Sequence, residues 1–312
     1  MRAAAATVDR TTRGMACLTL LALLAACAPS RAAGAAEGLS VAASPAPPSA
    51  TARTTSTEPP APRATPSATP TAPSPTPTVG AGVPFVIGRS VGDRPLEVFR
   101  FGGGPRQLLI VAGIHGGYEW NTIALADELI GLLQSEPERV PDDVTLFILR
   151  ALNPDGEARS HSYEGRANDH GVDLNRNWPI NWHPDWDHTY CWHYLPITAG
   201  DHPLSEPETA ALIRFILDHD FEGMISYHSA ALGIFPGGSP PDTASARLAA
   251  ALAAVSGYLY PPRDYGCEYT GQFADWAASQ GIPAVDIELT NHTDTDFDIN
   301  VAVLDTFLTW RP

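Results

Sequence analysis

The sequence predicts an α/β domain with a single mixed, mostly parallel central sheet and helices on both of its faces. After residue 82, strand-like segments alternate with helix-like segments, which is the pattern of domains built on a largely parallel sheet. Some of the strand-like runs are apolar on both faces, as buried central strands are. Polar residues directly follow several of these runs, and in such sheets binding sites collect at the carboxyl ends of strands.

The amino-terminal half of this domain contains strands and one long helix. Residues 83–107 hold two strand-like segments around a Gly-Asp turn, and the apolar run Leu108–Ala112 follows as a buried strand. In residues 119–134 the apolar side chains recur at helical spacing, which predicts a helix with one buried face. The apolar run Val144–Leu149 predicts the next strand.

The carboxyl-terminal half continues the alternation. A helix is predicted within residues 204–219, with Ser205 as its cap and Pro207 in its first turn, where proline is well tolerated. The remaining elements are, in chain order, the strand Met224–Tyr227, the helix Thr243–Tyr258, the short helix Phe273–Ser279, the strand Pro283–Leu289 and the helix Asp298–Thr309.

The first 27 residues have the features of an export signal. Three arginines precede an apolar run from Met15 to Ala26, which is too short to span a bilayer but has the length of a signal-peptide core. The run ends in Leu24-Ala25-Ala26-Cys27, and small residues before a Cys resemble a bacterial lipobox. We therefore expect residues 1–27 to be a lipoprotein-type signal, with Cys27 lipidated on the outer face of the cytoplasmic membrane. The alternative is an ordinary secretory signal that is cleaved nearby.

Residues 28–82 form a segment rich in Pro, Thr, Ala and Ser that can bury no core, so we expect a disordered, extended linker. The catalytic domain is then 83–312. The chain has a formal net charge of −16 and contains arginine but no lysine. This acidity makes nucleic acid an unexpected partner.

Two cysteines, Cys191 and Cys267, remain after the signal segment. Outside the cell such a pair can form a disulfide. The alternative is two separate buried thiols.

Polar side chains follow three of the predicted strands, His115, Asn153 and His228, and Glu288 lies at the end of a fourth. A hydrolytic zinc takes three protein ligands and leaves a position for water, and two His with one Glu is a known set. His115, Glu119 and His228 would provide this set. His115 and Glu119 are four residues apart where a similar zinc motif has three, but a loop before the helix can absorb the difference.

The segment 164–179, "EGRANDHGVDLNRNWP", is dense in polar groups. Arg166 and Arg176 carry planar, bidentate donors that suit a carboxylate or an oxyanion, and Asn175 adds another donor. The alternative is a charged surface loop. Two arginines within ten or so residues after a strand favour a binding site.

Seven motifs in order connect this domain to a known family: "GIHGGYEW", "NPDG", "GRANDHGVDLNRNWP", "SEPE", "ISYHS", "YTGQFADW" and "IEL". They span roughly residues 84–312, and "GVDLNRNW" is the most specific of them. The domain resembles the zinc carboxypeptidases related to carboxypeptidase A. Its short form is similar to the bacterial branch that includes murein-peptide amidases and γ-D-glutamyl-diaminopimelate peptidases.

The resemblance implies a site with one zinc ion. Its ligands are His115, Glu119 and His228, and Asp173 matches the acid that orients His115 through the other ring nitrogen. Arg166 matches the residue that polarises the scissile carbonyl and stabilises the oxyanion.

The resemblance also implies the remaining roles. Asn175 and Arg176 match the pair that binds the terminal carboxylate of the substrate, and Glu288 matches the general base. Tyr269 matches the mobile tyrosine that covers the substrate, with Tyr265 as the alternative because the spacing of this segment differs from that of longer relatives.

The expected activity is hydrolysis of a peptide bond near a free carboxyl terminus, in peptides or in peptidoglycan stem peptides. Ala274 falls where the family sets side-chain preference, and a small apolar residue there gives no charge-based reason to expect a basic substrate side chain. One alternative is a zinc amidase or deacylase that acts on N-acyl amino acids or murein amides. The other is an inactive, lipid-anchored binding protein. We expect a monomer whose only membrane contact is through Cys27.

Overall fold

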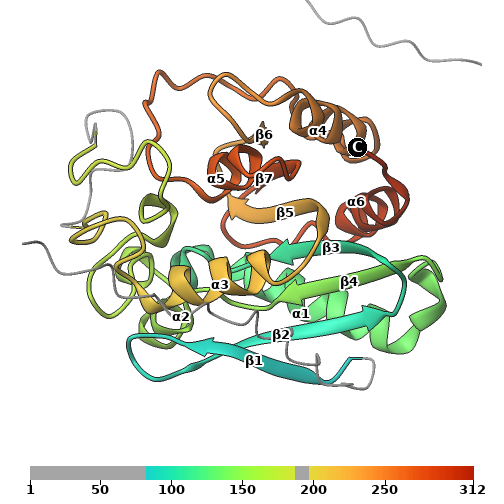
Figure 1. Ribbon diagram of the computed structural model, residues 1–312, viewed down its shortest axis with the longest axis horizontal. Coiled ribbons are helices and arrows are strands. Elements are labelled where there is room, and N and C mark those ends of the chain that lie inside the picture. Colours follow the sequence, from blue (N-terminus) through green and yellow to red (C-terminus); the bar gives the residue numbers. More distant parts are fainter. Residues whose placement is uncertain (1–81, 187–196) are drawn as a thin grey trace, which may run out of the picture. The chain divides into compact units, whose positions relative to one another are not determined.

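The computed structural model describes residues 82–186 and 197–312. Its centre is a seven-stranded sheet with the strand order β1-β2-β4-β3-β5-β7-β6 (Figure 1). The strands are β1 (Pro84–Arg89), β2 (Pro95–Gly102), β3 (Arg106–Val111), β4 (Val144–Leu149), β5 (Phe221–Ser229), β6 (Gly233–Pro236) and β7 (Ala284–Leu289).

The four central strands β4, β3, β5 and β7 run parallel to one another. Strands β1, β2 and β6 extend the sheet on its two sides with antiparallel pairing. This arrangement confirms the predicted mixed sheet with a parallel centre. Strand β5 is longer than its predicted apolar run because its polar ends also pair with neighbouring strands, and the short edge strand β6 was not predicted.

Six α-helices and four short 3-10 helices connect the strands in the described part of the chain. The α-helices are α1 (Trp120–Ser135), α2 (Pro154–Arg159), α3 (Pro207–Leu217), α4 (Thr243–Ser256), α5 (Phe273–Ser279) and α6 (Phe297–Thr309). The 3-10 helices are η1 (Gly116–Glu119), η2 (Pro137–Arg139), η3 (Tyr163–Gly165) and η4 (Leu174–Arg176). Helix α2 was not predicted from the sequence, and Asn153 caps it by accepting a hydrogen bond from the Gly156 N–H at 2.8 Å.

Two apolar clusters cover the two faces of the sheet, and the alternation of side chains along β3 separates them. Leu108 and Ile110 belong to the cluster that includes α1, α4 and α6. Leu109 and Val111 belong to the opposite cluster, which includes α3 and α5. The predicted cover of helices on both faces is therefore confirmed.

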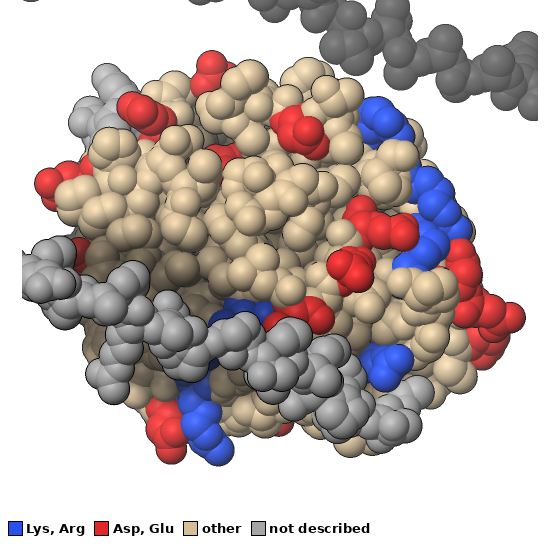
Figure 2. Space-filling view, viewed as in Figure 1, with Lys and Arg blue, Asp and Glu red and all other residues tan. Residues whose placement is uncertain are grey.

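Charged groups at the surface pair locally. Most basic side chains on the face drawn in Figure 2 lie beside acidic ones. The ion pairs of the described residues include Arg139 with Asp305 at 2.8 Å and Arg311 with Asp143 at 2.7 Å. Exposed pairs of this kind contribute little to the free energy of unfolding, so the two apolar clusters carry most of the stability.

Several predictions concern residues outside the described ranges. They are the signal segment 1–27 with Cys27, nearly all of the linker 28–82, and Cys191 of the expected disulfide. Cys267 is disulfide-bonded, and its partner is likewise outside the described residues. Among residues 82–186 and 197–312, no helix combines the length and the apolar character that crossing a membrane requires.

Candidate metal centre and substrate cleft

A tight turn after β3 positions the first two candidate ligands. His115 precedes the 3-10 helix η1, and Glu119 ends that helix directly before α1. Gly116 has φ +48, a conformation that suits glycine, and a Cβ on Gly117 would lie 2.0 Å from the Ser160 carbonyl oxygen. The 3-10 turn and its glycines thus accommodate the four-residue spacing between His115 and Glu119.

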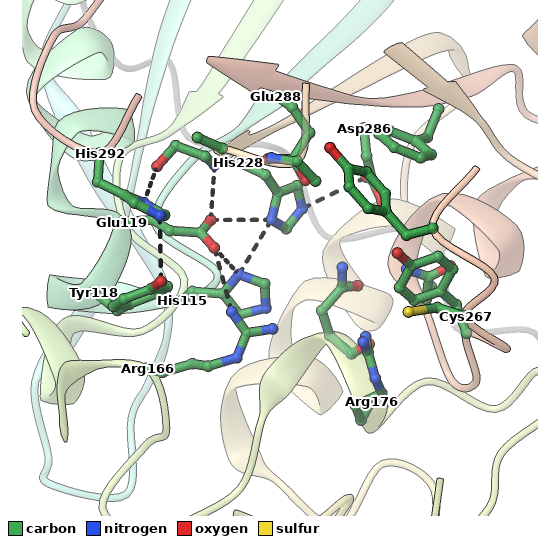
Figure 3. Close-up of a pocket in the computed structure, with 18 residues that line it drawn as sticks. His115, Tyr118, Glu119, Arg166, Arg176, His228, Cys267, Asp286, Glu288 and His292 are labelled. Carbon is green, nitrogen blue, oxygen red and sulfur yellow. Dashed lines mark hydrogen bonds and ion pairs between the residues drawn. The ribbon is translucent and has the colours of Figure 1, made fainter. Parts of the chain in front are cut away.

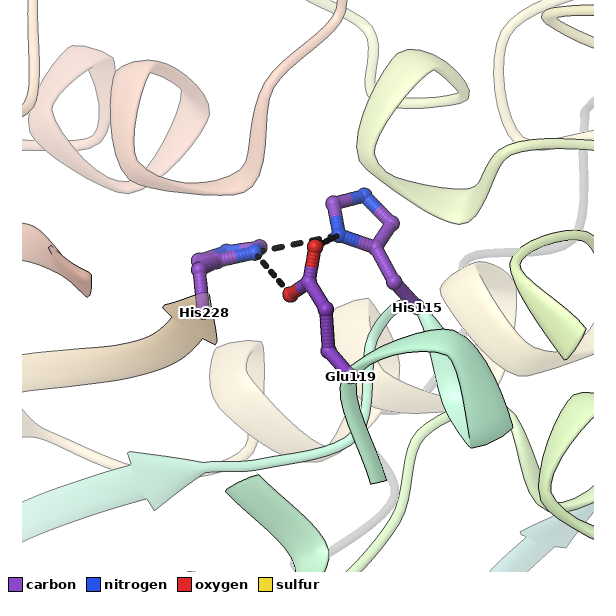
Figure 4. A group of neighbouring side chains, drawn as sticks. All are labelled: His115, Glu119 and His228. Carbon is purple, nitrogen blue, oxygen red and sulfur yellow. Dashed lines mark hydrogen bonds and ion pairs between the residues drawn. The ribbon is translucent and has the colours of Figure 1, made fainter. Parts of the chain in front are cut away.

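The side chains of His115, Glu119 and His228 converge on one point (Figure 4). The Glu119 carboxylate lies 2.7 Å from His115 Nδ1 through Oε1 and 3.2 Å from His228 Nδ1 through Oε2. The two Nδ1 atoms are 3.2 Å apart. All three side chains are buried, and β5 supplies His228 from its carboxyl end.

The second nitrogen of each imidazole has its own partner. His115 Nε2 lies 3.2 Å from Asp173 Oδ1, and His228 Nε2 lies 2.9 Å from the Ser226 hydroxyl oxygen. These contacts fix the ring orientations and leave both Nδ1 atoms directed at Glu119, as metal-binding histidines require.

Asp173 also holds Arg166 beside the same point. Arg166 Nε donates to Asp173 Oδ2 at 3.0 Å, and Arg166 Nη1 donates to Glu119 Oε1 at 3.3 Å. The Asn175 backbone N–H donates to Asp173 Oδ1 at 2.9 Å. Burial opposes the ionisation of Asp173, but Arg166 and His115 beside it hold its pKa well below the usual range.

Glu119 is ionised for a similar reason. Burial alone would raise the pKa of this carboxyl, yet His115 and His228 beside it hold the pKa below its usual range. The Ser229 backbone N–H also donates to Glu119 Oε2 at 3.2 Å. The group therefore offers a negative oxygen to a cation.

Glu288 stands next to His228 in the register of β7 with β5. Its Oε2 accepts a hydrogen bond from the Ala231 N–H at 2.9 Å. Burial raises the pKa of Glu288 to about 7, and the negative charge of Glu119 contributes to the increase while His228 opposes it. A carboxylate with a pKa near neutrality can accept and release a proton at physiological pH.

A cationic group lines the same cleft as the three candidate ligands. The buried Arg176 guanidinium donates to the Asn175 carbonyl oxygen at 2.7 Å and lies 5.6 Å from the ring centre of Tyr269. The Asn175 side-chain oxygen accepts from the Phe273 N–H at 2.9 Å, which leaves the amide nitrogen as the donor for a bound molecule. Burial lowers the pKa of Arg176, and Asp173 opposes this change.

A cleft of about 310 Å³ contains these groups (Figure 3). Its walls include every predicted ligand, catalytic residue and substrate-binding residue. Asp173 does not line the cleft but contacts His115, Arg166 and Asn175, which do. Tyr265 and Tyr269 both line it, and Tyr265 is the more exposed of the two. The fold thus brings the predicted residues together from five separate segments of the chain.

The family model for zinc carboxypeptidases matches residues 83–307. The chain belongs to this family. It is 28% identical over 253 residues to mouse carboxypeptidase A6, covering 67% of this chain and 56% of the relative. It is 28% identical over 234 residues to murein peptide amidase A of Escherichia coli K12, covering 72% of this chain and 89% of the relative. The chain thus spans little more than half of the carboxypeptidase A6 sequences that it matches.

Solved structures show the same fold. The murein-tripeptide amidase of Escherichia coli O157 superposes with a TM-score of 0.55 at 25% identity, over 73% of this chain and 92% of the amidase. Bovine thrombin-activatable fibrinolysis inhibitor gives a TM-score of 0.56 at 20% identity, over 72% of this chain and 86% of that chain, and supports the fold alone.

The three candidate ligands fit the zinc ion of this family. Two imidazole nitrogens and a carboxylate oxygen are a known zinc donor set with one position left open. Two Nδ1 atoms that face each other at 3.2 Å are both satisfied when a cation lies between them and the Glu119 carboxylate. Zinc is therefore the cofactor of this zinc carboxypeptidase domain, and His115, Glu119 and His228 form the group that can hold it.

Sequence reasoning missed several residues that line or support the cleft of this zinc carboxypeptidase domain. Ser226 contacts His228, and Asp286 lines the cleft. Tyr118 and His292 also line the cleft, at the end away from Asp286 (Figure 3). The Tyr118 hydroxyl lies 3.2 Å from His292 Nε2. Ser226 and Asp286 could have been found from period-two alternation, because they precede His228 and Glu288 by two positions on neighbouring strands.

Proposed function

We propose that this protein is a zinc-dependent peptidase that hydrolyses an amide bond near a free carboxyl terminus. The observation that carries the proposal is one cleft that is lined by the candidate zinc ligands, Glu288 and the Arg176 side chain. A proton acceptor and a carboxylate-binding cation in the same cleft as a zinc site are the parts that such a reaction needs.

Glu288 is the general base in this proposal. His115, Glu119 and His228 would hold the zinc ion, which would supply a water molecule of lowered pKa and a polarised carbonyl group. Glu288 removes the proton of that water as its oxygen attacks, and then delivers the proton to the leaving amine nitrogen. A pKa of about 7 suits a group that must both accept and release a proton in one cycle.

Arg166 and Arg176 bind different parts of the substrate. Arg166, held by Asp173, donates hydrogen bonds to the carbonyl oxygen of the scissile bond as negative charge develops there. Arg176 and the Asn175 amide nitrogen bind the terminal carboxylate, which fixes the distance from the chain end to the bond that breaks. Tyr269 covers the bound residue, because its ring lies 5.6 Å from the Arg176 guanidinium. Tyr265, on the same wall of the cleft, is the alternative cover.

The substrates that we propose are peptides or peptidoglycan stem peptides. The similarity to murein peptide amidase A over most of that protein's length supports the second class. It also favours a second candidate function, a zinc amidase or deacylase on murein amides or N-acyl amino acids. The half-buried carboxylate of Glu288 beside the candidate ligands argues against an inactive binding protein.

The cellular location is proposed from the sequence alone. The apolar run before Cys27 and the Pro-rich segment 28–82 support export, either as a lipoprotein on the outer face of the cytoplasmic membrane or as a secreted protein. Labelling with a radioactive fatty acid tests this, because label on the wild type and not on Cys27→Ala indicates lipidation at Cys27.

Product analysis tests the proposed reaction. The purified protein is incubated with a panel of peptides, N-acyl amino acids and muropeptides, with and without a chelator, and the products are identified by mass spectrometry. We expect one zinc per chain, loss of a single carboxyl-terminal residue from peptides, and no products after chelation. Protein that lacks zinc, or that releases only acyl groups or fragments from the middle of a peptide, contradicts the proposal.

A further inference from the structure

The motif Asn153-Pro154-Asp155-Gly156 follows β4 and has no role in the proposed reaction. Asn153 is fully buried and does not line the cleft. A residue that caps a helix needs only its side-chain oxygen, and the Asn153 oxygen caps α2 by accepting from the Gly156 N–H. The amide nitrogen of Asn153 is therefore left for another partner.

That partner is the backbone of Arg166. Asn153 Nδ2 donates to the Arg166 carbonyl oxygen at 3.0 Å, and both residues are buried. The Asn153 backbone N–H donates to the Gly113 carbonyl oxygen at 2.9 Å, two residues after the end of β3. Asn153 thus connects Arg166 to the carboxyl end of a central strand. Loss of one partner from a buried hydrogen bond is costly, because the other partner stays buried and unsatisfied.

Gly156 makes a close contact with the same segment. A Cβ on Gly156 would lie 2.1 Å from the Gly165 carbonyl oxygen, which belongs to the peptide unit directly before Arg166. Asp155 anchors the motif to the turn after β1 by accepting a hydrogen bond from the Ser90 hydroxyl at 2.5 Å. The motif therefore fixes the peptide units on both sides of the Arg166 Cα.

These contacts determine where the Arg166 side chain begins. Asp173 holds its other end, since Arg166 Nε donates to Asp173 Oδ2 at 3.0 Å. An arginine side chain has many rotamers, so one fixed end does not define the position of the guanidinium. With both ends held, the guanidinium lies in the cleft beside Glu119 (Figure 3). A donor for an oxyanion must be held in place before the reaction, because a displacement of about 1 Å can cost roughly 100-fold in rate.

The pair proposed to bind the terminal carboxylate is held by a different set of contacts. Arg176 ends η4, and the next residue, Asn177, donates to the Ala199 carbonyl oxygen at 2.8 Å and accepts from the Thr209 hydroxyl at 2.7 Å. The Asn153 side chain bonds to Gly156 and Arg166 instead. A change at Asn153 therefore acts on Arg166 and leaves the contacts around Arg176 in place.

We infer that Asn153 is a positioning residue for Arg166. It fixes the backbone from which the guanidinium reaches the oxyanion, and it touches neither the substrate nor the metal. This inference rests on the proposed peptidase function and adds a residue on which stabilisation of the oxyanion depends. The oxyanion forms only as the carbonyl group is attacked, so loss of this support lowers kcat and leaves KM nearly unchanged.

Asn153→Ser tests the inference, because serine keeps an oxygen that can cap α2 and removes the amide donor. The matched control is Asp242→Ser, which makes a similar change at the cap of α4, away from the cleft lining. Steady-state kinetics on one peptide substrate and the zinc content are measured for each protein. We expect kcat of Asn153→Ser to fall by about 10- to 100-fold, with KM and zinc content close to those of the wild type. The control should keep the kcat of the wild type.

A double-variant cycle separates positioning of Arg166 from a general structural effect. In the Arg166→Ala background the group through which Asn153 acts is absent, so Asn153→Ser should change kcat by less than about threefold. Gly156→Ala is a second way to disturb the same backbone, because it displaces the Gly165 carbonyl group. It should lower kcat in the wild type and have little effect in Arg166→Ala. Gly156→Ala decides the inference if Asn153→Ser does not fold.

The outcomes separate the inference from the proposed function. Wild-type kcat in Asn153→Ser, an equal fall of kcat in both backgrounds, or loss of zinc overturns the inference while peptidase activity stands. If the wild type cleaves no peptide, the proposed function fails. The cycle is then run on binding of a phosphinic peptide, whose charged oxygen stands in for the oxyanion, and the same is done if Arg166→Ala has no measurable turnover. Weaker binding in Asn153→Ser that disappears in the Arg166→Ala background supports the inference, and equal binding or no binding by the wild type overturns it.

Discussion

Asp173 Oδ1 lies 3.2 Å from His115 Nε2, on the opposite side of the imidazole from Glu119. The same carboxylate binds the Arg166 guanidinium through Oδ2 at 3.0 Å. One buried acid therefore sets the orientation of a candidate zinc ligand and of the group proposed to stabilise the oxyanion. It acts on a substrate through these two residues and through Asn175, whose backbone N–H donates to Asp173 Oδ1.

Replacement of Asp173 by Asn should weaken the contacts that orient His115 and Arg166. The amide keeps the shape of the side chain but removes the negative charge that His115 and Arg166 share. We expect zinc affinity to fall by about 10- to 100-fold, the usual effect of removing such a supporting carboxylate. Competition with a fluorescent chelator measures this affinity, and Asp305→Asn at the surface is the matched control. Equal zinc affinity in both variants would show that Asp173 does not support the metal.

The glycines of the turn between His115 and Glu119 lead to a second prediction. A Cβ on Gly117 would lie 2.0 Å from the Ser160 carbonyl oxygen, so Gly117→Ala must displace the turn. We expect Gly117→Ala to lower the free energy of unfolding by about 1–3 kcal/mol, as overpacking does, and to weaken zinc binding because the two ligands flank this position.

Gly131→Ala is the matched control for that substitution. Gly131 is an exposed residue of α1, and among the described residues no atom other than its chain neighbours and the nearby helix backbone lies within 4 Å of the position of its Cβ. Alanine favours a helix over glycine by up to about 1 kcal/mol, so this variant should be as stable as the wild type or more stable, with unchanged zinc affinity. Thermal unfolding and chelator competition compare the two variants. Similar losses in both would contradict a specific role for the turn.

Glu208 leads to a prediction about how the free energy of unfolding depends on pH, and this prediction does not involve the metal. Burial raises its pKa to about 7, although the Val91 N–H donates to it at 3.1 Å, and the negative charge of Asp155 adds to the increase. The folded state thus binds this proton more tightly than the unfolded state, whose pKa is near 4.5. The contribution of Glu208 to stability is complete below pH 4.5 and is lost as pH rises through 7.

Replacement of Glu208 by Gln removes this pH-dependent loss. The variant should exceed the wild type in free energy of unfolding by about 2 kcal/mol at pH 8, and the difference should vanish near pH 4. Urea denaturation at both pH values measures it. If the two proteins differ in free energy of unfolding by the same amount at both pH values, Glu208 titrates at its ordinary pKa in the folded protein.

Local patterns in the sequence predicted much of the fold and part of the site. Apolar runs such as Leu108–Ala112 are readable because burial on both faces of a sheet requires them, and polar residues at strand ends pointed to the cleft. The four-residue spacing of His115 and Glu119 left their geometry open, since only the 3-10 turn shows how the two side chains meet.

Other features depend on contacts between distant segments and were not readable. Asp286 resembles an ordinary polar residue in a strand, and only the fold shows that it lines the cleft with Arg176, more than a hundred residues away in the chain. Ala274, by contrast, drew attention from its position in a family motif, yet its side chain is buried away from the cleft lining.

The assignment of Glu288 as the general base can be separated from metal binding. Glu288 is half-buried beside His228, but its Oε2 accepts from the Ala231 N–H and it is not one of the three candidate ligands. Glu288→Gln keeps the size of the side chain and its hydrogen-bonding oxygen, while the amide can no longer accept the proton of water. We therefore expect kcat to fall by about 100- to 10,000-fold, with zinc content and KM close to those of the wild type.

Steady-state kinetics and metal analysis of the same preparations test this assignment. The exposed Glu138→Gln is the matched control, because it removes one carboxylate far from the cleft lining. Full activity in Glu288→Gln would exclude Glu288 as the base and leave the peptidase reaction itself intact. Loss of zinc in that variant, with activity restored by added zinc, would assign Glu288 to the metal site. Loss of kcat with zinc retained is the result that proton transfer by Glu288 requires.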